Sequence, residues 1–350
     1  MSQNAFLLEP IPPFRLDLTA WTLRRRPDNA IDRWDGTTYR RVLTPAGGPV
    51  EVAVVQTGPP ESPRLRVMVH GALLSPELKQ FVTAALEQLL GFRTDLAAFY
   101  RLASRDAELG PLAQRFRGMK PPRFPSVFEC VVNAIANQQV TLTLGIRVLS
   151  LLAEAHGPVV AGEEGPAHAF PRPEDLARLD PDQFRQLGFS RQKGRAIIEL
   201  AQISAEGHAD LEKLAALPDE EAIARLCRLR GVGRWSAEYV LLRRMGRVHI
   251  FPGDDVGARN NLQRWLRLAD PLDYEAVRRT LARWHPYGGL IYFHLLLDRI
   301  AEAGYLPEDR QEATETLADM ELVDEAGRES FPSSDPPSWT PLTAGPPERG

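Results

Sequence analysis

LCRLRGVGRWSAEY, residues 226–239, contains two helical segments separated only by the Gly-Val-Gly corner at 231–233. Glycines let the backbone turn through dihedral angles closed to other residues and leave no side chain between backbone and ligand. The free N–H groups at the start of the second helix point outward, and the helix dipole favours an anion there. The segment therefore predicts a hairpin that holds one phosphate, although the glycines taken alone are more typical of a simple tight corner.

A pair of acidic residues, Asp254 and Asp255, follows this hairpin closely. Residues 234–245 have the length of a three-turn helix that ends before Gly246, and a short link at 247–253 leads to a third helix. We therefore expect a carboxylate beside the hairpin. A helix-opening aspartate is most often an N-cap, and we assign that role to Asp254.

The sequence divides into an N-terminal α+β domain at 1–110 and a helical domain at 111–306, which contains the hairpin. Alternating β-branched runs at 37–43, 50–55 and 65–69 predict a small antiparallel sheet, and Ser75 predicts the N-cap of a helix that ends before Gly91. From about residue 95 to residue 304, strand signals disappear and short helices follow one another. Ser126 and Glu129 have the spacing of a capping box before one of them.

Composition sets limits on the class of protein. Residues 307–350 are acidic and then rich in Pro and Ser, which predicts a disordered tail. The net charge of −4 is uneven, because residues from 308 onward hold eleven Asp/Glu and three Arg and so leave +4 on the remainder. That balance permits a basic face that meets phosphate. No stretch has the length of a membrane span, and we expect an intracellular protein without a membrane partner.

The hairpin and the downstream carboxylate together resemble the helix-hairpin-helix DNA glycosylases, the HhH-GPD superfamily. In that family a hairpin of the form LxxLxGVGxxxA precedes one essential aspartate at a near-fixed distance. Asp255 lies 20 residues after Trp235, which is the family's spacing.

Further segments are similar to the bacterial 3-methyladenine DNA glycosylase II type. FECVVNAIANQQV at 128–140 resembles that group's FExxVxAIxxQQV helix and wedge loop, and FPRP at 170–173, LGFSRQK at 187–193 and WHPY at 284–287 resemble others of its segments. The resemblance covers most of residues 10–305. It implies an α+β fold, with a β-sheet N-terminal domain followed by an all-α glycosylase domain.

The resemblance also implies an activity, the hydrolysis of alkylated bases such as 3-methyladenine and 7-methylguanine from duplex DNA. Breaking the N-glycosidic bond develops positive charge on the sugar, which a carboxylate at Asp255 would stabilise while it takes a proton from water. Family members that also cut the backbone carry a lysine where this chain has Trp235. We therefore expect a monofunctional enzyme.

Aromatic residues are expected to hold the base after it leaves the helical stack. Trp235 and Tyr239 share a helix face, an arrangement more often found in a core, but their match to family pocket positions favours the pocket. The family's main stacking tryptophan falls near Leu296, so we expect Tyr292, Phe293 or Phe128 to contribute instead.

Contacts to DNA are expected from the hairpin and from the wedge loop, with Gln139 inserted into the gap in the duplex. The residues expected to touch DNA are Gly231, Val232, Gly233, Arg234, Ser236, Arg230, Gln138 and Gln139. The chain is expected to act as a monomer on damaged double-stranded DNA in the bacterial cytoplasm, associated with the nucleoid.

Two other activities remain open on the sequence. The same Asp255 would serve a glycosylase for deaminated or oxidised bases, and a non-catalytic DNA-binding module would explain the glycines and arginines. Seven His and two Cys show no close ligand cluster, so we expect no metal cofactor. The resemblance implies only that a monovalent cation could sit on the hairpin carbonyls.

Overall fold

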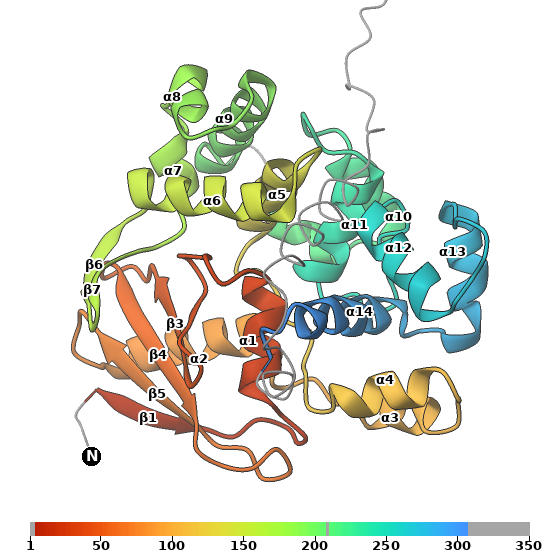
Figure 1. Ribbon diagram of the computed structural model, residues 1–350. Helices are drawn as coiled ribbons and strands as arrows, with labels where there is room; N and C mark the ends of the chain where they lie inside the picture. The colour runs from red at the N-terminus through yellow and green to blue at the C-terminus, as the bar shows by residue number, and fades with distance from the viewer. Residues whose placement is uncertain (1–3, 208–209, 307–350) are drawn as a thin grey trace, which may run out of the picture.

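A five-stranded antiparallel sheet and a larger group of helices make up the computed structural model, which describes residues 4–207 and 210–306. Figure 1 shows the sheet on one side of the molecule and most of the helices on the other. The predicted α+β fold is confirmed. The expected acidic tail at 307–350 lies outside the described residues. Within the described ranges, no helix is long and apolar enough to cross a lipid bilayer.

The sheet has the strand order β1-β5-β4-β3-β2, with every neighbouring pair antiparallel. The three central strands were predicted from their alternating residues, whereas the two short edge strands were not. Side chains from the sheet pack with those of α1 and α2 in one apolar core. The strands are β1 (Ala5–Leu8), β2 (Arg33–Trp34), β3 (Thr38–Leu43), β4 (Val50–Gln56) and β5 (Leu65–His70), and the helices are α1 (Leu16–Arg24) and α2 (Pro76–Leu90).

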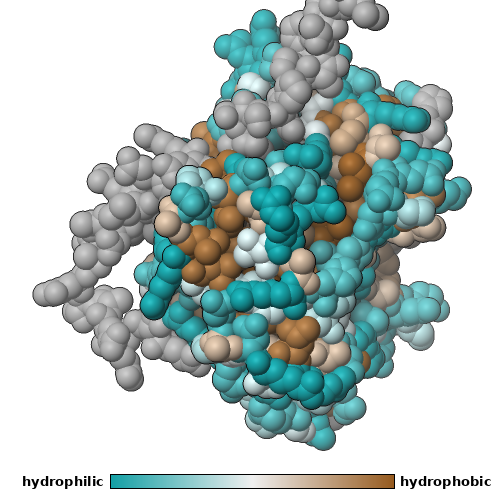
Figure 2. All heavy atoms as spheres, turned by 90° about the vertical axis from the view of Figure 1, so that its right-hand side faces the viewer, coloured by the Kyte–Doolittle hydropathy of each residue, from teal (hydrophilic) through white to brown (hydrophobic). Residues whose placement is uncertain are grey.

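Helices α3 to α14 form most of the rest of the described chain. The hairpin separates α10 (Asp219–Leu226) from α11 (Arg234–Arg243), and α12 (Val256–Trp265) follows the acidic pair. The remaining helices are α3 (Ala97–Ala103), α4 (Leu109–Arg115), α5 (Val127–Asn137), α6 (Leu142–His156), α7 (Pro173–Leu176), α8 (Pro181–Gln186), α9 (Arg191–Ala205), α13 (Tyr274–Leu281) and α14 (Gly288–Glu302). Figure 2 shows the face on the α12 and α13 side, where hydrophobic residues surface in patches between hydrophilic ones.

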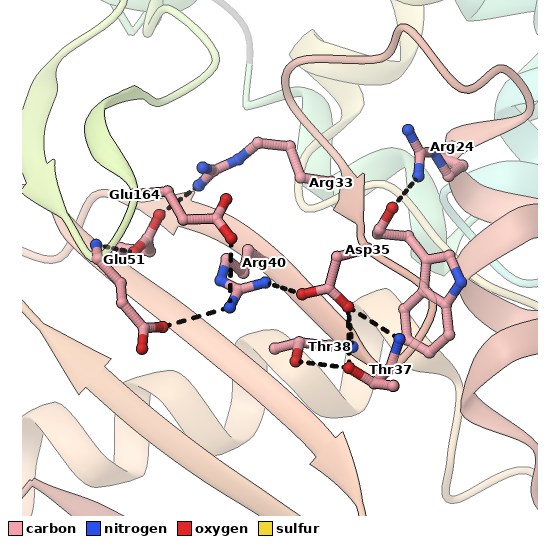
Figure 3. Close-up of polar contacts among 10 residues, drawn as sticks. Arg24, Arg33, Asp35, Thr37, Thr38, Arg40, Glu51 and Glu164 are labelled. Carbon is pink, nitrogen blue, oxygen red and sulfur yellow. Dashed lines mark hydrogen bonds and ion pairs between the residues drawn. The ribbon is translucent and has the colours of Figure 1, made fainter.

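A two-stranded hairpin, β6 (Val159–Gly162) and β7 (Gly165–His168), interrupts the helical segment and corrects the expectation that strands end near residue 95. It reaches from the helices to the sheet, where Glu51 of β4 accepts from the Glu163 amide at 3.0 Å and also pairs with Arg33. Arg40 of β3 pairs with Asp35 and lies 3.5 Å from Glu164 (Figure 3). The strands are too short to give a clear alternating pattern, which is why the sequence did not reveal them.

The expected capping box at the start of α5 is only half present. The Ser126 hydroxyl accepts from the Glu129 amide at 3.1 Å, as a helix N-cap does. The Glu129 carboxylate, however, does not return to the N-cap and instead accepts from Arg41 of the sheet at 2.5 Å. Arg41 also donates to Asp32 at 2.7 Å. A buried ion cluster thus joins the sheet to the helix that leads to the wedge loop.

Candidate active site

A pocket opens where α11, α12, α14 and the end of α5 meet the C-terminal end of α1. It has about 90 Å³ of free space, less than the roughly 150 Å³ of an engineered cavity that holds benzene. The lining residues are Arg25, Asn137, Leu142, Trp235, Tyr239, Asp255, Gly257, Ala258, Asn261, Tyr292, Leu295 and Leu296.

Asp255 lies in this pocket with its carboxylate buried. Its Oδ1 accepts from the Ala258 amide at 2.9 Å and its Oδ2 accepts from Trp235 Nε1 at 3.2 Å, while the Tyr292 hydroxyl lies 3.4 Å from Oδ2. Burial raises the pKa of Asp255 to about 6, and the hydrogen bonds from Ala258, Trp235 and Tyr292 limit the rise. The carboxylate is therefore ionised at neutral pH, but at a cost in desolvation.

The N-cap assignment to Asp254 is wrong, because Asp255 itself caps α12. Asp254 instead accepts from Arg234 Nε at 2.6 Å. The sequence could not show which of the two aspartates is the N-cap, because the two assignments shift the helix start by only one residue.

Three of the aromatic residues named for the pocket line it, whereas Phe128 and Phe293 do not. The rings of Trp235 and Tyr239 lie 5.5 Å apart at 32°, and Tyr292 contributes from α14. Phe128 does not belong to the lining: it packs against Phe170, 6.4 Å between ring centroids, inside the helical core. The prediction failed for Phe128 because α5 is buried along its whole length and turns that ring away from the pocket.

Several pocket residues escaped the sequence analysis, among them Arg25 and Asn137. Arg25, at the C-terminal end of α1, donates to the Tyr239 hydroxyl at 3.1 Å and to Asn133 Oδ1 at 3.0 Å. Asn137, the last residue of α5, donates from Nδ2 to the Asn133 carbonyl at 2.8 Å. Arg25 is far from the hairpin in sequence and sits in an ordinary run of arginines, so only the packing of the sheet domain on the helices identifies it. Asn137 stands inside the motif that resembles the wedge helix, which was the available signal.

The hairpin itself has the features of an anion site. Gly231 has φ +75, in the left-handed region, and a side chain there would press on Ala196. Gly233 is the N-cap of α11 and has no side chain to cap the amides of the first turn. A helix start with no side-chain cap suits an external anion.

The arginines expected to bind DNA already have acidic partners. Arg230 Nε lies 2.8 Å from Glu199, and Arg234 pairs with Asp254. Both arginines are exposed on the surface, where such pairs contribute little and exchange readily.

Gln138 and Ser236, both expected to contact DNA, bond to each other and to the hairpin. Gln138 Nε2 donates to the Gly231 carbonyl at 2.8 Å and to the buried Ser236 hydroxyl at 2.9 Å. Gln139, in contrast, is exposed and has φ +54, so it stands out from the loop as a wedge would. Lys193 Nζ holds the same loop through the carbonyls of Ala136 and Gln138, at 3.0 and 2.5 Å.

Among the described residues, no group of three or more His, Cys, Asp or Glu side chains is arranged to hold a metal ion. A monovalent cation on the hairpin carbonyls remains a prediction. The Gly231 carbonyl would be one candidate ligand, and it already accepts one hydrogen bond from Gln138.

Comparisons with known proteins agree with this geometry. A family model described as HhH-GPD superfamily base excision DNA repair protein matches residues 132–286, which include the hairpin and Asp255. A putative DNA-3-methyladenine glycosylase of Bacillus subtilis, YfjP, is 26% identical over 291 residues, which are 83% of this chain and 97% of the relative. A second B. subtilis protein, a DNA-3-methyladenine glycosylase, is 31% identical over 169 residues, 48% of this chain and 56% of the relative.

A solved structure has the same arrangement of sheet and helices. The 3-methyladenine DNA glycosylase from Archaeoglobus fulgidus superposes with a TM-score of 0.73 at 25% identity, covering 85% of this chain and 99% of that one. Residues 132–286, which the family model matches, contain the hairpin, the wedge loop and the buried carboxylate. Residues 132–286 form a region of the HhH-GPD superfamily of base excision DNA repair proteins.

Proposed function

We propose that the chain is a monofunctional DNA glycosylase that hydrolyses the N-glycosidic bond of alkylated bases, such as 3-methyladenine and 7-methylguanine, in duplex DNA. The single observation that carries this proposal is the buried carboxylate of Asp255 in an aromatic pocket beside a hairpin with an uncapped helix start. The names of two relatives and of the superposed structure, all 3-methyladenine glycosylases, support the choice of lesion.

The chemistry follows from the position of that carboxylate. As the bond to the base breaks, positive charge develops on the sugar, and an ionised Asp255 in a low-dielectric pocket stabilises it. The same oxygen can take a proton from the attacking water. Trp235 Nε1 and the Ala258 amide hold the two oxygens in fixed directions, so little reorganisation is needed during the reaction.

A Schiff-base mechanism lacks its nucleophile at this site. Trp235 stands at the position where the lyase members of the family carry a lysine, and Lys193, whose ammonium is tied to two loop carbonyls, does not line the pocket. Water is therefore the nucleophile in this proposal, and the product is an abasic site.

Binding of the duplex is assigned to the hairpin and the wedge loop. The first turn of α11 takes one backbone phosphate, which fixes the register without reading a base sequence. Gln139 fills the space that the flipped nucleotide leaves, and the base enters between Trp235, Tyr239 and Tyr292. The planar rings suit an electron-poor alkylated base.

The test is base release from duplex DNA that contains 3-methyladenine or 7-methylguanine, with wild type and Asp255→Asn, and binding to the same DNA measured in parallel. We expect wild type to release bases, and the variant to bind within about threefold of wild type but to release them at least about a thousandfold more slowly. Tyr100→Phe, on the remote α3, is the control.

Two results would contradict the proposal. If wild type binds damaged DNA but frees neither base, the alkylation assignment fails, and release of hypoxanthine or 8-oxoguanine from matched duplexes becomes the next measurement. If Asp255→Asn remains active, the assigned carboxylate is wrong.

A further inference from the structure

A second buried carboxylate, Glu238, lies on α11 outside the pocket lining. Its side chain is 3% exposed. Its Oε1 accepts from the Tyr274 hydroxyl of α13 at 2.6 Å, and its Oε2 accepts from the Gly253 amide at 3.2 Å. Gly253 precedes the acidic pair, so Glu238 ties the turn that carries Asp255 to the hairpin helix.

The ring of Tyr274 packs directly under that turn. A Cβ built on Gly253 would lie 2.6 Å from Tyr274 Cδ2, so a side chain at 253 would collide with the ring. The guanidinium of Arg234 covers the same ring, 3.8 Å from its centroid, and pairs with Asp254 at 2.6 Å. Glu238 of α11 and Tyr274 of α13 thus hold Gly253, and the exposed Arg234 adds a weaker contact to Asp254.

This brace, defined as Arg234, Glu238, Gly253, Asp254 and Tyr274, has a direct consequence for the pocket. The Asp255 amide donates to the Pro252 carbonyl at 3.0 Å, so residues 252–255 move as one turn. Oδ2 of Asp255 meets Trp235 only while that turn keeps its place. A displacement of about 1 Å at a reacting group can cost about a hundredfold in rate.

We propose that Glu238, together with Tyr274, is a positioning residue for the reaction, because it fixes the turn that aims Asp255 into the pocket. The proposal rests on the glycosylase activity proposed above. Neither residue touches the substrate pocket, so their effect is on the rate of the chemical step and not on the affinity for DNA.

Charge around Glu238 sets the design of the test. The groups that face it are Tyr274 from α13, Asp254 from the turn and Arg234 from its own helix. Burial has the largest effect on the pKa of Glu238 and raises it to about 7. Glutamine keeps the shape and one acceptor and can donate to the Tyr274 oxygen, so Glu238→Gln separates geometry from charge.

The experiment compares single-turnover base release and DNA affinity in Tyr274→Phe, Glu238→Ala and Glu238→Gln. Tyr39→Phe is the matched control, because it removes another buried tyrosine hydroxyl that donates to a carboxylate, that of Asp32 at 2.7 Å. We expect the rate to fall about tenfold in Tyr274→Phe and more in Glu238→Ala, with affinity within about twofold of wild type. We expect Glu238→Gln to release bases within about threefold of the wild-type rate, and Tyr39→Phe to release them at the wild-type rate.

A readout independent of activity is the titration of the Asp255 carboxyl, followed by carbon NMR and assigned with Asp255→Asn. We expect a looser turn to admit water and lower the pKa of Asp255 in Tyr274→Phe but not in Tyr39→Phe. Unchanged rate and unchanged titration in both Tyr274→Phe and Glu238→Ala would overturn the proposal and leave the brace a purely structural contact. If wild type releases no base, the proposed function fails, and the titration alone decides whether the brace positions Asp255.

Discussion

At the scale of single residues, Asp255 has two tasks that use different oxygens. Oδ1 caps α12 through the Ala258 amide, and Oδ2 faces Trp235 and the pocket. The cap fixes the side chain in one rotamer, and the second oxygen remains directed at the reacting centre. Because both oxygens are buried, the ionised carboxylate is poorly solvated. A positive charge that forms next to it therefore stabilises it strongly.

The raised pKa of Asp255 predicts an acid limb in the pH profile. Protonated Asp255 cannot stabilise a cationic sugar, so single-turnover base release should rise tenfold per pH unit below about pH 6 and level off above it. The profile should be measured between pH 4.5 and 8.5 on duplexes carrying a single lesion. A rate that stays flat down to pH 4.5 would show that ionised Asp255 is not needed.

Arg25 predicts an effect on lesion preference. Its guanidinium lies in the pocket wall and opposes the charge of a cationic base, while it can donate to the acceptors of a neutral one. Arg25→Met should raise the release of 7-methylguanine relative to neutral hypoxanthine by about tenfold. The measurement is the ratio of the two single-turnover rates, with Arg26→Met as the control. An unchanged ratio would mean that Arg25 only supports Tyr239 and Asn133.

At the scale of secondary-structure elements, the loop between α5 and α6 is anchored on three sides. Lys193 of α9 holds the carbonyls of Ala136, at the end of α5, and of Gln138. The Gln138 side chain bonds to the hairpin, and Thr141 caps α6 through the Leu144 amide. Only Gln139 is left exposed between these anchors. A side chain that inserts between stacked nucleobases needs a rigid loop to support it, and the anchored loop gives Gln139 that support.

The two glutamines of that loop should therefore differ in effect. Gln139→Ala should slow base flipping about tenfold, because nothing then fills the gap, whereas Gln138→Ala should act through both the loop and the hairpin and also weaken DNA binding. Flipping can be followed by the fluorescence of 2-aminopurine placed beside the lesion. Gln202→Ala on α9, which removes a surface bond to the Ala177 carbonyl, is the control. Equal flipping rates in Gln139→Ala and wild type would contradict the wedge role.

At the scale of the whole molecule, the sheet domain is part of the active site. It supplies Arg25 to the pocket, and the buried pairs of Arg41 with Asp32 and Glu129 fix the sheet against α5. The β6–β7 strand pair makes a second contact between the helical region and the sheet, through Glu51 and Arg40 (Figure 3). The two regions therefore position the pocket jointly.

Loss of Arg41 should be among the most damaging substitutions away from the pocket. Arg41→Met leaves two carboxylates buried without their cation, and the free energy of unfolding should fall by about 3–5 kcal/mol. The exposed pair of Arg225 with Glu221 offers a matched control, and Arg225→Met should change stability by less than about 0.5 kcal/mol. Urea denaturation at pH 7.5 measures both. Similar losses of stability in the two variants would show that the buried ion pairs of Arg41 contribute no more than an exposed pair.

The sequence by itself determined the features that depend on neighbours along the chain. Alternation predicted the central strands, Ser75 and Ser126 marked helix starts, and the spacing from the Gly-Val-Gly corner to Asp255 indicated both the hairpin and the carboxylate. Each of these signals is local, because hydrogen bonds within a helix or at its cap join residues only a few positions apart.

Tertiary structure alone decided which side chains meet. It brought Arg25 into the pocket across more than two hundred residues of sequence, turned Phe128 into the core, and placed Glu238 and Tyr274 under the catalytic turn. It also moved the N-cap role from Asp254 to Asp255. These outcomes depend on how whole helices pack against each other and against the sheet, and burial and long-range pairing of this kind leave no periodic signal in a single sequence.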